Sequence, residues 1–160
     1  MDDMYDSPDP DDERAIVRVI HRYARGVDTG EIALVRDCYW SGAMDYHAGF
    51  TGPVEAYCEW LAEMLPGVDV VTHMMMNVEV GAATDDGSVR RSTARSYCLN
   101  AMVWHVAEGP DRHVLSGLVY DDAFECRDTQ WRIAERRCTR LWTRLENVAT
   151  DAALPLGMEK

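Results

Sequence analysis

The sequence predicts an α+β fold in which helices close one end of a strongly curved antiparallel sheet and leave a pocket between them. Three observations support this prediction. Apolar residues recur with helical spacing up to residue 67, and beyond residue 68 they alternate with the period of two that is typical of strands. Several strand positions that should point inward are also polar, and a packed core rarely contains so many polar side chains.

Three helices are expected before residue 68, each with apolar residues on one face at intervals of three and four. They cover residues 13–27, 31–39 and 53–65. Asp11 or Asp12 is the expected N-cap of the first helix, because a short acidic side chain can accept hydrogen bonds from the first backbone N–H groups. Pro53 suits the first turn of the third helix.

Four strands follow, separated by turns, over residues 70–80, 89–106, 113–126 and 130–145. Asp85-Asp86-Gly87 is a strong hairpin signal ahead of the second strand. Alternation places two sets of side chains on opposite faces of the first strand: Val71, His73, Met75 and Asn77, and Met74, Met76, Val78 and Val80. One face of the second strand carries the mixed set Ser96, Cys98, Asn100, Met102 and Trp104.

Length and charge indicate one domain with a short tail at each end. A chain of 160 residues fits a single domain. Residues 1–12 are expected to be a disordered acidic leader, because the first 13 residues hold seven acidic side chains and no basic one. The domain is then expected to span residues 13–146, and residues 147–160 form a C-terminal tail.

The composition argues against several classes of partner. A net charge of −12 disfavours nucleic acid and anionic membrane surfaces. No apolar run could span a bilayer and no signal peptide opens the chain, so we expect a cytoplasmic protein. The five cysteines lack any C-x-x-C pair and indicate reduced thiols. His21, His47, His105 and His113 show no ligand spacing, so we expect no metal.

His73 and Asp28 are the strongest candidates for chemistry. Imidazole titrates near working pH, and in apolar surroundings it can remove a proton from carbon when a carboxylate fixes its tautomer. Asp28, at the end of the first helix, is a candidate for that carboxylate. The structural alternatives are a buried His73 bonded to backbone and an Asp28 that caps the next helix. Asp28 and Glu31 have the spacing of a capping box, and on the sequence alone capping is the stronger interpretation.

Tyr23, Tyr46 and Arg140 can contact polar atoms of a substrate. Each phenol can donate a hydrogen bond to a carbonyl or to a leaving hydroxyl, with core packing as an equal alternative. Arg140 would supply a fixed positive charge for an oxyanion, although an arginine on a solvated face is the commoner arrangement. Motifs for nicotinamide binding, phosphate binding and serine hydrolysis are missing, so we expect no cofactor.

Motifs at four places together resemble the SnoaL-like branch of the nuclear-transport-factor-2-like superfamily. They are the stretch from Ile20 to Gly30, Asp45-Tyr46 with Gly52-Pro53, Thr72 to Asn77, and Trp131 to Arg136. The resemblance covers about residues 12–145 and implies a cone-shaped α+β barrel with three helices packed on a curved sheet around a deep pocket. The motifs are most similar to those of the scytalone dehydratase, hexachlorocyclohexane dehydrochlorinase and bile acid 7α-dehydratase group.

This resemblance also implies roles for individual residues. The enzymes of that group are cofactor-free lyases, and their Asp–His pair falls on Asp28 and His73. A Tyr and an Arg of the bile acid enzymes fall on Tyr23 and Arg140, whereas an acidic residue of their middle strand falls on Asn100, which departs from that pattern. The residues that we expect to bind substrate are Tyr46, Asn100, Met75, Tyr120 and Trp104.

The sequence therefore predicts a cofactor-independent lyase that performs a dehydratase-type elimination on a hydrophobic cyclic, polyketide-like or steroid-like molecule. An isomerase or a polyketide cyclase would use the same His–Asp pair. A non-catalytic subunit or small-molecule-binding module is an alternative of another class. The outer sheet face, with Tyr97, Leu99, Ala101 and Val103, is apolar enough for self-association, and we expect a homo-oligomer with a trimer favoured over a dimer.

Overall fold

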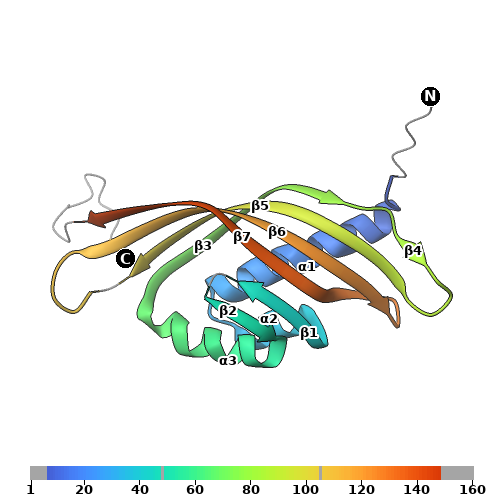
Figure 1. Ribbon diagram of the computed structural model, residues 1–160, viewed down its shortest axis with the longest axis horizontal. Coiled ribbons are helices and arrows are strands. Elements are labelled where there is room, and N and C mark those ends of the chain that lie inside the picture. The colour runs from blue at the N-terminus through green and yellow to red at the C-terminus, as the bar shows by residue number, and fades with distance from the viewer. Residues whose placement is uncertain (1–6, 48, 105, 149–160) are drawn as a thin grey trace.

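A curved sheet of seven strands wraps around the long first helix, and the shorter helices lie beneath it (Figure 1). This computed structural model describes residues 7–47, 49–104 and 106–148. Half of the expected leader (residues 1–6), His105 and the tail after residue 148 lie outside the described residues. The elements in chain order are α1 (Pro10–Asp28), α2 (Ile32–Asp37), β1 (Tyr39–His47), β2 (Phe50–Pro53), α3 (Val54–Met64), the 3-10 turn η1 (Leu65–Gly67), β3 (Val68–Val80), β4 (Thr84–Asp85), β5 (Arg90–Trp104), β6 (Asp111–Arg127) and β7 (Gln130–Val148).

The sheet confirms the predicted α+β fold. Its strand order is β2-β1-β7-β6-β5-β3, and the short β4 pairs with β5. The strands from β3 to β7 pair antiparallel, whereas β1 joins β7 in parallel, so the sheet is mixed. The long strands β5, β6 and β7 form the curved body, and helix α1 packs against β3 and β7 on the concave side (Figure 1).

The first helix begins earlier than the sequence predicts. Its N-cap is Asp9, whose carboxylate accepts hydrogen bonds from the backbone of Asp11 and Asp12, and Pro10 occupies its first turn. Asp12 is instead buried, where it accepts a hydrogen bond from the Trp131 indole at 3.0 Å and pairs with Arg90. The expected caps at Asp11 and Asp12, and a leader that extends to residue 12, are therefore wrong. The ordered domain includes this acidic turn because it anchors the helix to the sheet.

The second helix is shorter than predicted because the chain turns into a strand. Helix α2 ends at Asp37, and Tyr39 already pairs with β7 as the first residue of β1. The carbonyl of Cys38 accepts a hydrogen bond from the backbone of Ile133 at 2.9 Å. Strand β1 is absent from the prediction because its register shifts between Tyr39 and Met44 and its partner β7 lies far along the chain.

A bulge in β3 changes which side chains face inward. Asn77 has a φ of +48°, and the register with β5 shifts between Met76 and Glu79. His73 therefore shares the inner face with Val78 and Val80, which the prediction had placed on the opposite face. Asn77 itself is exposed in the bulge, not inward as expected, because the extra residue of a bulge takes no part in the alternation.

The centre of the protein contains a buried ion pair. Arg136 on β7 is fully buried and lies opposite Asp122 on β6. Its guanidinium donates two hydrogen bonds of 2.7 Å to the two carboxylate oxygens of Asp122. The same guanidinium lies 4.0 Å from the centre of the Tyr23 ring and 4.6 Å from that of Tyr120. This cation therefore connects strands β6 and β7 with the aromatic rings of Tyr23 on α1 and Tyr120 on β6.

The outer face of the sheet is apolar at one edge. Met74 and Met76 of β3 are 42% and 44% exposed, and Tyr97, directly opposite Met76 on β5, is 40% exposed. Leu99 lies opposite Met74 on the same face. These four residues form the outer patch, which shares Tyr97 and Leu99 with the apolar face that the sequence predicts.

Replacing Asp122 with Asn is expected to destabilise the fold strongly. The substitution removes the only carboxylate that bonds Arg136 among the described residues and leaves a buried cation uncompensated. Loss of one partner of a buried pair costs about 3–5 kcal/mol in the free energy of unfolding. Urea denaturation measures this quantity.

Asp121→Asn is the matched control. Asp121 is the chain neighbour of Asp122, but it points outward and forms an exposed ion pair with Arg95 at 3.4 Å. Exposed pairs contribute about 1 kcal/mol or less. Equal losses of stability in the two variants would contradict a central role for the Arg136–Asp122 pair.

Candidate active site

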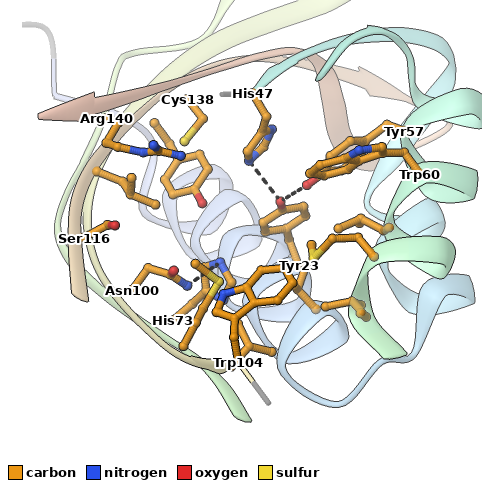
Figure 2. Close-up of a pocket in the computed structure, with 18 residues that line it drawn as sticks. Tyr23, His47, Tyr57, Trp60, His73, Asn100, Trp104, Ser116, Cys138 and Arg140 are labelled. Carbon is orange, nitrogen blue, oxygen red and sulfur yellow. Dashed lines mark hydrogen bonds between the residues drawn. The ribbon is translucent and has the colours of Figure 1, made fainter. Parts of the chain in front are cut away.

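A cavity of about 230 Å³ opens between the concave face of the sheet and helices α1 and α3. Its wall is mostly apolar and aromatic, with contributions from Val27, Trp60, Leu61, Met64, Leu65, Val71, Met102, Trp104 and Leu118. A few polar groups converge on it: Tyr23, His47, Tyr57, His73, Asn100, Ser116, Tyr120, Cys138 and Arg140 (Figure 2). A concave cavity with a mostly apolar wall and convergent polar groups is typical of a small-molecule site.

One carboxylate holds His73 at the edge of this cavity. Asp28, the last residue of α1, accepts a hydrogen bond of 2.6 Å at Oδ1 from the His73 ring atom Nδ1. The backbone N–H of His73 also donates to both carboxylate oxygens, at 3.0 and 3.1 Å. Because backbone and ring bond the same group, the orientation of the imidazole relative to α1 is fixed.

The capping role expected for Asp28 is wrong. The N-cap of α2 is Glu31, and no side chain forms a capping hydrogen bond there. The Asp28 carboxylate points toward β3 instead, because its oxygens are occupied by the backbone and ring of His73. His73 likewise uses its ring to bond a carboxylate, not the backbone of its surroundings.

The hydrogen bonds define which nitrogen of His73 can act as a base. A carboxylate only accepts hydrogen bonds, so Nδ1 carries the hydrogen that is directed at Asp28. The amide nitrogen of Asn100 lies 3.2 Å from Nε2 and can donate to its lone pair. Since Asn100 also lines the cavity, the basic nitrogen is on the cavity side of the ring.

A second chain of polar groups lies on the other wall. The hydroxyl of Tyr23 on α1 is 2.6 Å from that of Tyr57 on α3 and 3.4 Å from Nε2 of His47 on β1 (Figure 2). The other ring nitrogen of His47 bonds Asp45, two residues earlier on the same strand. Asp45 is fully buried, and its second oxygen accepts a hydrogen bond of 2.7 Å from Tyr39.

The wall that carries His47 combines a positive charge with neutral phenols. Burial alone would lower the pKa of His47, but the hydrogen bond to Asp45 and the neighbouring Cys138 raise this pKa to about 9. Burial also raises the pKa of the Tyr23 phenol far above its usual value, so this hydroxyl keeps its hydrogen. His47 therefore carries a positive charge at neutral pH beside neutral phenols.

The structure brings together most of the residues that the sequence singles out. Tyr23, His73, Asn100, Trp104, Tyr120 and Arg140 all line the cavity. Tyr46 does not, because it alternates with the inward-facing Asp45 and His47 on β1 and lies instead under the guanidinium of Arg137, 4.0 Å from the ring centre. Met75 shares the inner face of β3 but packs against the core outside the cavity lining. Tyr46 and Met75, which the sequence predicts to bind substrate, therefore lie outside the set of residues that line this cavity.

Sequence reasoning missed His47, Asp45 and Tyr57. A signal for the first two is present, because an Asp and a His two residues apart on a strand share one face. This signal was hidden because β1 itself was not predicted. Tyr57 occupies an apolar position on α3, where nothing in the sequence separates a core phenol from one at a cavity.

Other features of the described residues bear on the class of site. All five cysteines are free. Within the part of the chain that the structure describes, no three His, Cys, Asp or Glu side chains gather as metal ligands. No helix among those residues is both long and apolar enough to cross a membrane.

Comparison with known sequences finds a family and uncharacterised relatives. A family described as a SnoaL-like domain matches residues 9–137. An uncharacterised protein of Mycobacterium tuberculosis and one of Mycobacterium bovis are each 32% identical to this chain over 105 residues. The alignment covers 64% of this chain, and the chain spans 66% of the length of these curated relatives.

Comparison with solved structures finds the same fold in proteins of low identity. A protein from Kribbella flavida aligns with a TM-score of 0.70 at 19% identity, over 85% of this chain and 95% of that one. A scytalone dehydratase candidate from Novosphingobium aromaticivorans has a TM-score of 0.67 at 20% identity, over 93% and 95%. A hexachlorocyclohexane dehydrochlorinase from Novosphingobium barchaimii has a TM-score of 0.64 at 17% identity, over 88% and 92%.

The raised pKa of His47 predicts a specific dependence of stability on pH. A histidine whose folded pKa exceeds its ordinary value of 6.5 stabilises the fold fully below that value. The contribution is lost as the pH rises through about 9. Between these limits we expect the free energy of unfolding to fall by on the order of 3 kcal/mol through this group.

The reference for this measurement is the double variant Asp45→Asn/His47→Gln, which removes both charges and keeps side chains of similar size. Urea denaturation of both proteins at a series of pH values isolates the contribution of the Asp45–His47 pair, because all titrating groups outside this pair are shared. Parallel pH profiles in the two proteins would contradict the raised pKa.

Proposed function

The chain belongs to the SnoaL-like domain family, and we propose that within this family it is a cofactor-independent lyase acting on a hydrophobic cyclic small molecule. The observation that carries the proposal is the 2.6 Å hydrogen bond between Asp28 and His73 at the wall of a mostly apolar cavity. A fold alone is a poor guide to activity, so the argument rests on this pair. The names of two structural neighbours, a dehydratase and a dehydrochlorinase, agree with elimination chemistry.

In the proposed reaction, Nε2 of His73 removes a proton from a carbon of the substrate. The electron pair of the broken C–H bond forms a double bond as the leaving group departs from the neighbouring carbon with its own bonding pair. Asp28 holds the imidazole in the tautomer whose Nε2 lone pair can accept a proton, and then stabilises the imidazolium. A positioned general base contributes about 10²–10⁴-fold to the rate.

The remainder of the rate acceleration would come from the cavity wall. Asn100 and Arg140 offer hydrogen-bond donors from β5 and β7, and both side chains border the same space as His73 (Figure 2). Donors fixed in a water-poor cavity stabilise the charge that develops on a substrate oxygen. Trp60 and Trp104 would pack against an apolar ring system.

We expect His73→Ala to reduce turnover by about 10²-fold or more, because the variant lacks the base. A panel of cyclic β-hydroxy ketones provides the assay, since elimination forms a conjugated enone that absorbs in the near ultraviolet and lowers the mass of the substrate by one water. Asp28→Asn is expected to show a smaller loss, because the amide can still accept a hydrogen bond from the ring but carries no charge.

His113→Ala is the control, since His113 is an exposed histidine on β6 and does not line the cavity. Circular dichroism of each variant separates loss of base from loss of fold. Full activity of His73→Ala would refute the proposed base. A product of unchanged mass that still depends on His73 would instead assign an isomerase or cyclase.

We also propose that the protein self-associates through the outer patch of Met74, Met76, Tyr97 and Leu99. Exposed apolar side chains that adjoin across two paired strands favour burial against a second copy. Sedimentation analysis is expected to give a mass above the 18.1 kDa of the monomer, with a trimer favoured. Tyr97→Glu should shift the protein toward monomer, and a wild-type monomer at micromolar concentration would contradict this prediction.

A further inference from the structure

The cavity has a base on one wall and a chain of hydrogen-bond donors on the other. We propose that Tyr23, Tyr57 and His47 form an oxygen-binding subsite that takes the carbonyl, enolate or departing hydroxyl oxygen of the substrate. In this subsite the phenols contact the oxygen, and His47 is a positioning residue whose positive charge is held by Asp45. The inference rests on the proposed function, because it names the substrate group that lies opposite the proton removed by His73.

Buried charges explain why His47 stays protonated. Asp45 is completely buried, and a buried carboxylate needs a positive partner. Arg136 lies opposite Asp45 in the register of β1 and β7, but its guanidinium donates its hydrogen bonds to Asp122. His47 is therefore the group left to neutralise Asp45, and it bonds that carboxylate directly through Nδ1.

The other groups around His47 do not compete for this role. The ring is stacked on Tyr57 at 5.0 Å between ring centres and tilted against Tyr120 at 5.7 Å. Several titratable or charged groups surround it: Asp45 on its own strand, Tyr23 on α1, Tyr57 on α3, Tyr120 on β6 and Cys138 on β7. Arg136, also on β7, lies behind the phenols. Among the described residues of this set, Asp45 is the carboxylate that bonds the ring.

The geometry leaves one hydrogen available to a ligand. Protonated Nε2 of His47 donates to the oxygen of Tyr23, 3.4 Å away. The hydroxyls of Tyr23 and Tyr57 share one hydrogen across 2.6 Å. Two hydroxyl hydrogens are present and one is used, so whichever phenol donates to the other, one O–H remains to point at an oxygen in the cavity.

The proton balance of an elimination fits this arrangement. The carbon proton goes to Nε2 of His73, the C–H electron pair becomes the new double bond, and the C–O bonding pair leaves with the oxygen. A phenol of the subsite protonates that oxygen, His47 replaces the phenol proton, and water is released. The products are an alkene and water, and a water molecule returns the proton from His73 to His47.

This arrangement defines a substrate class. The substrate would carry an oxygen across the cavity from its acidic C–H bond, and a departing hydroxyl would benefit most, because hydroxide needs a proton in order to leave. A halide leaves as a stable anion and would gain little from a proton donor. The subsite therefore favours dehydration over dehydrohalogenation.

Binding of 4-nitrophenol tests the subsite without knowledge of the substrate. The ionised probe is yellow and the neutral probe is not, so absorbance reports its charge in the cavity. At a pH below the pKa of the free probe, we expect wild-type protein to bind it as the phenolate. We expect His47→Gln to lower the bound phenolate fraction at least tenfold, more than Arg140→Gln does, and the surface variant His113→Ala to change it less than twofold.

Two results with wild-type protein would overturn the proposal: binding of the neutral phenol, or no saturable binding. Two results with the variants would also overturn it: a bound phenolate fraction that is unchanged in His47→Gln, or one that is lost in Arg140→Gln but not in His47→Gln. The activity of His73→Ala is measured separately, so a failure of the proposed base and a failure of the oxygen subsite give different outcomes.

A ring-nitrogen NMR titration covers the case in which His47→Gln does not fold. In wild-type protein the His47 ring should titrate near pH 9, and in Asp45→Asn its pKa should be lower by at least one unit. Asp45→Asn should then also bind a smaller fraction of 4-nitrophenol as the phenolate, a change that a merely structural histidine would not cause. Titration of wild-type His47 at or below 6.5 would overturn the proposal.

Discussion

The ion pair between Arg136 and Asp122 is the interaction around which the rest of the molecule is arranged. It joins the two central strands, and the guanidinium contacts the faces of Tyr23 and Tyr120, so helix and sheet are packed on one cation. Cations are attracted to aromatic faces most strongly where water is excluded. Tyr23 and Tyr120 consequently form an aromatic layer at the back of the cavity, and their hydroxyl groups are among the polar groups that line it.

Charge balance in the interior separates the tasks of the cavity groups. Asp122 neutralises Arg136, and Asp45 is left to His47, so each buried carboxylate has its own cation. Asp28 is more accessible than either and holds His73 at the rim. The two histidines of the cavity therefore have separate carboxylate partners, Asp28 for His73 and Asp45 for His47.

Much of the fold and half of the chemistry could be predicted from local pattern. Alternating residues in long strands place His73 and Asn100 on one face, and helical spacing brings Asp28 to the end of α1. What local pattern cannot supply is register. The bulge at Asn77 moves Val78 to the other face, and the parallel pairing of β1 with β7 brings His47 to the cavity from a segment that resembles a loop. Both depend on partners distant in the chain.

The double attachment of His73 to Asp28 has a consequence for selectivity by size. Backbone and ring of one residue bond the carboxylate that ends α1, so the orientation of the His73 ring is fixed only while α1 and β3 remain in contact. A molecule too wide for the cavity would push these two elements apart and break the bonds that orient the imidazole. Under the proposed function, such a ligand would itself stop the reaction, and the attachment of one helix end would set the upper limit on substrate width.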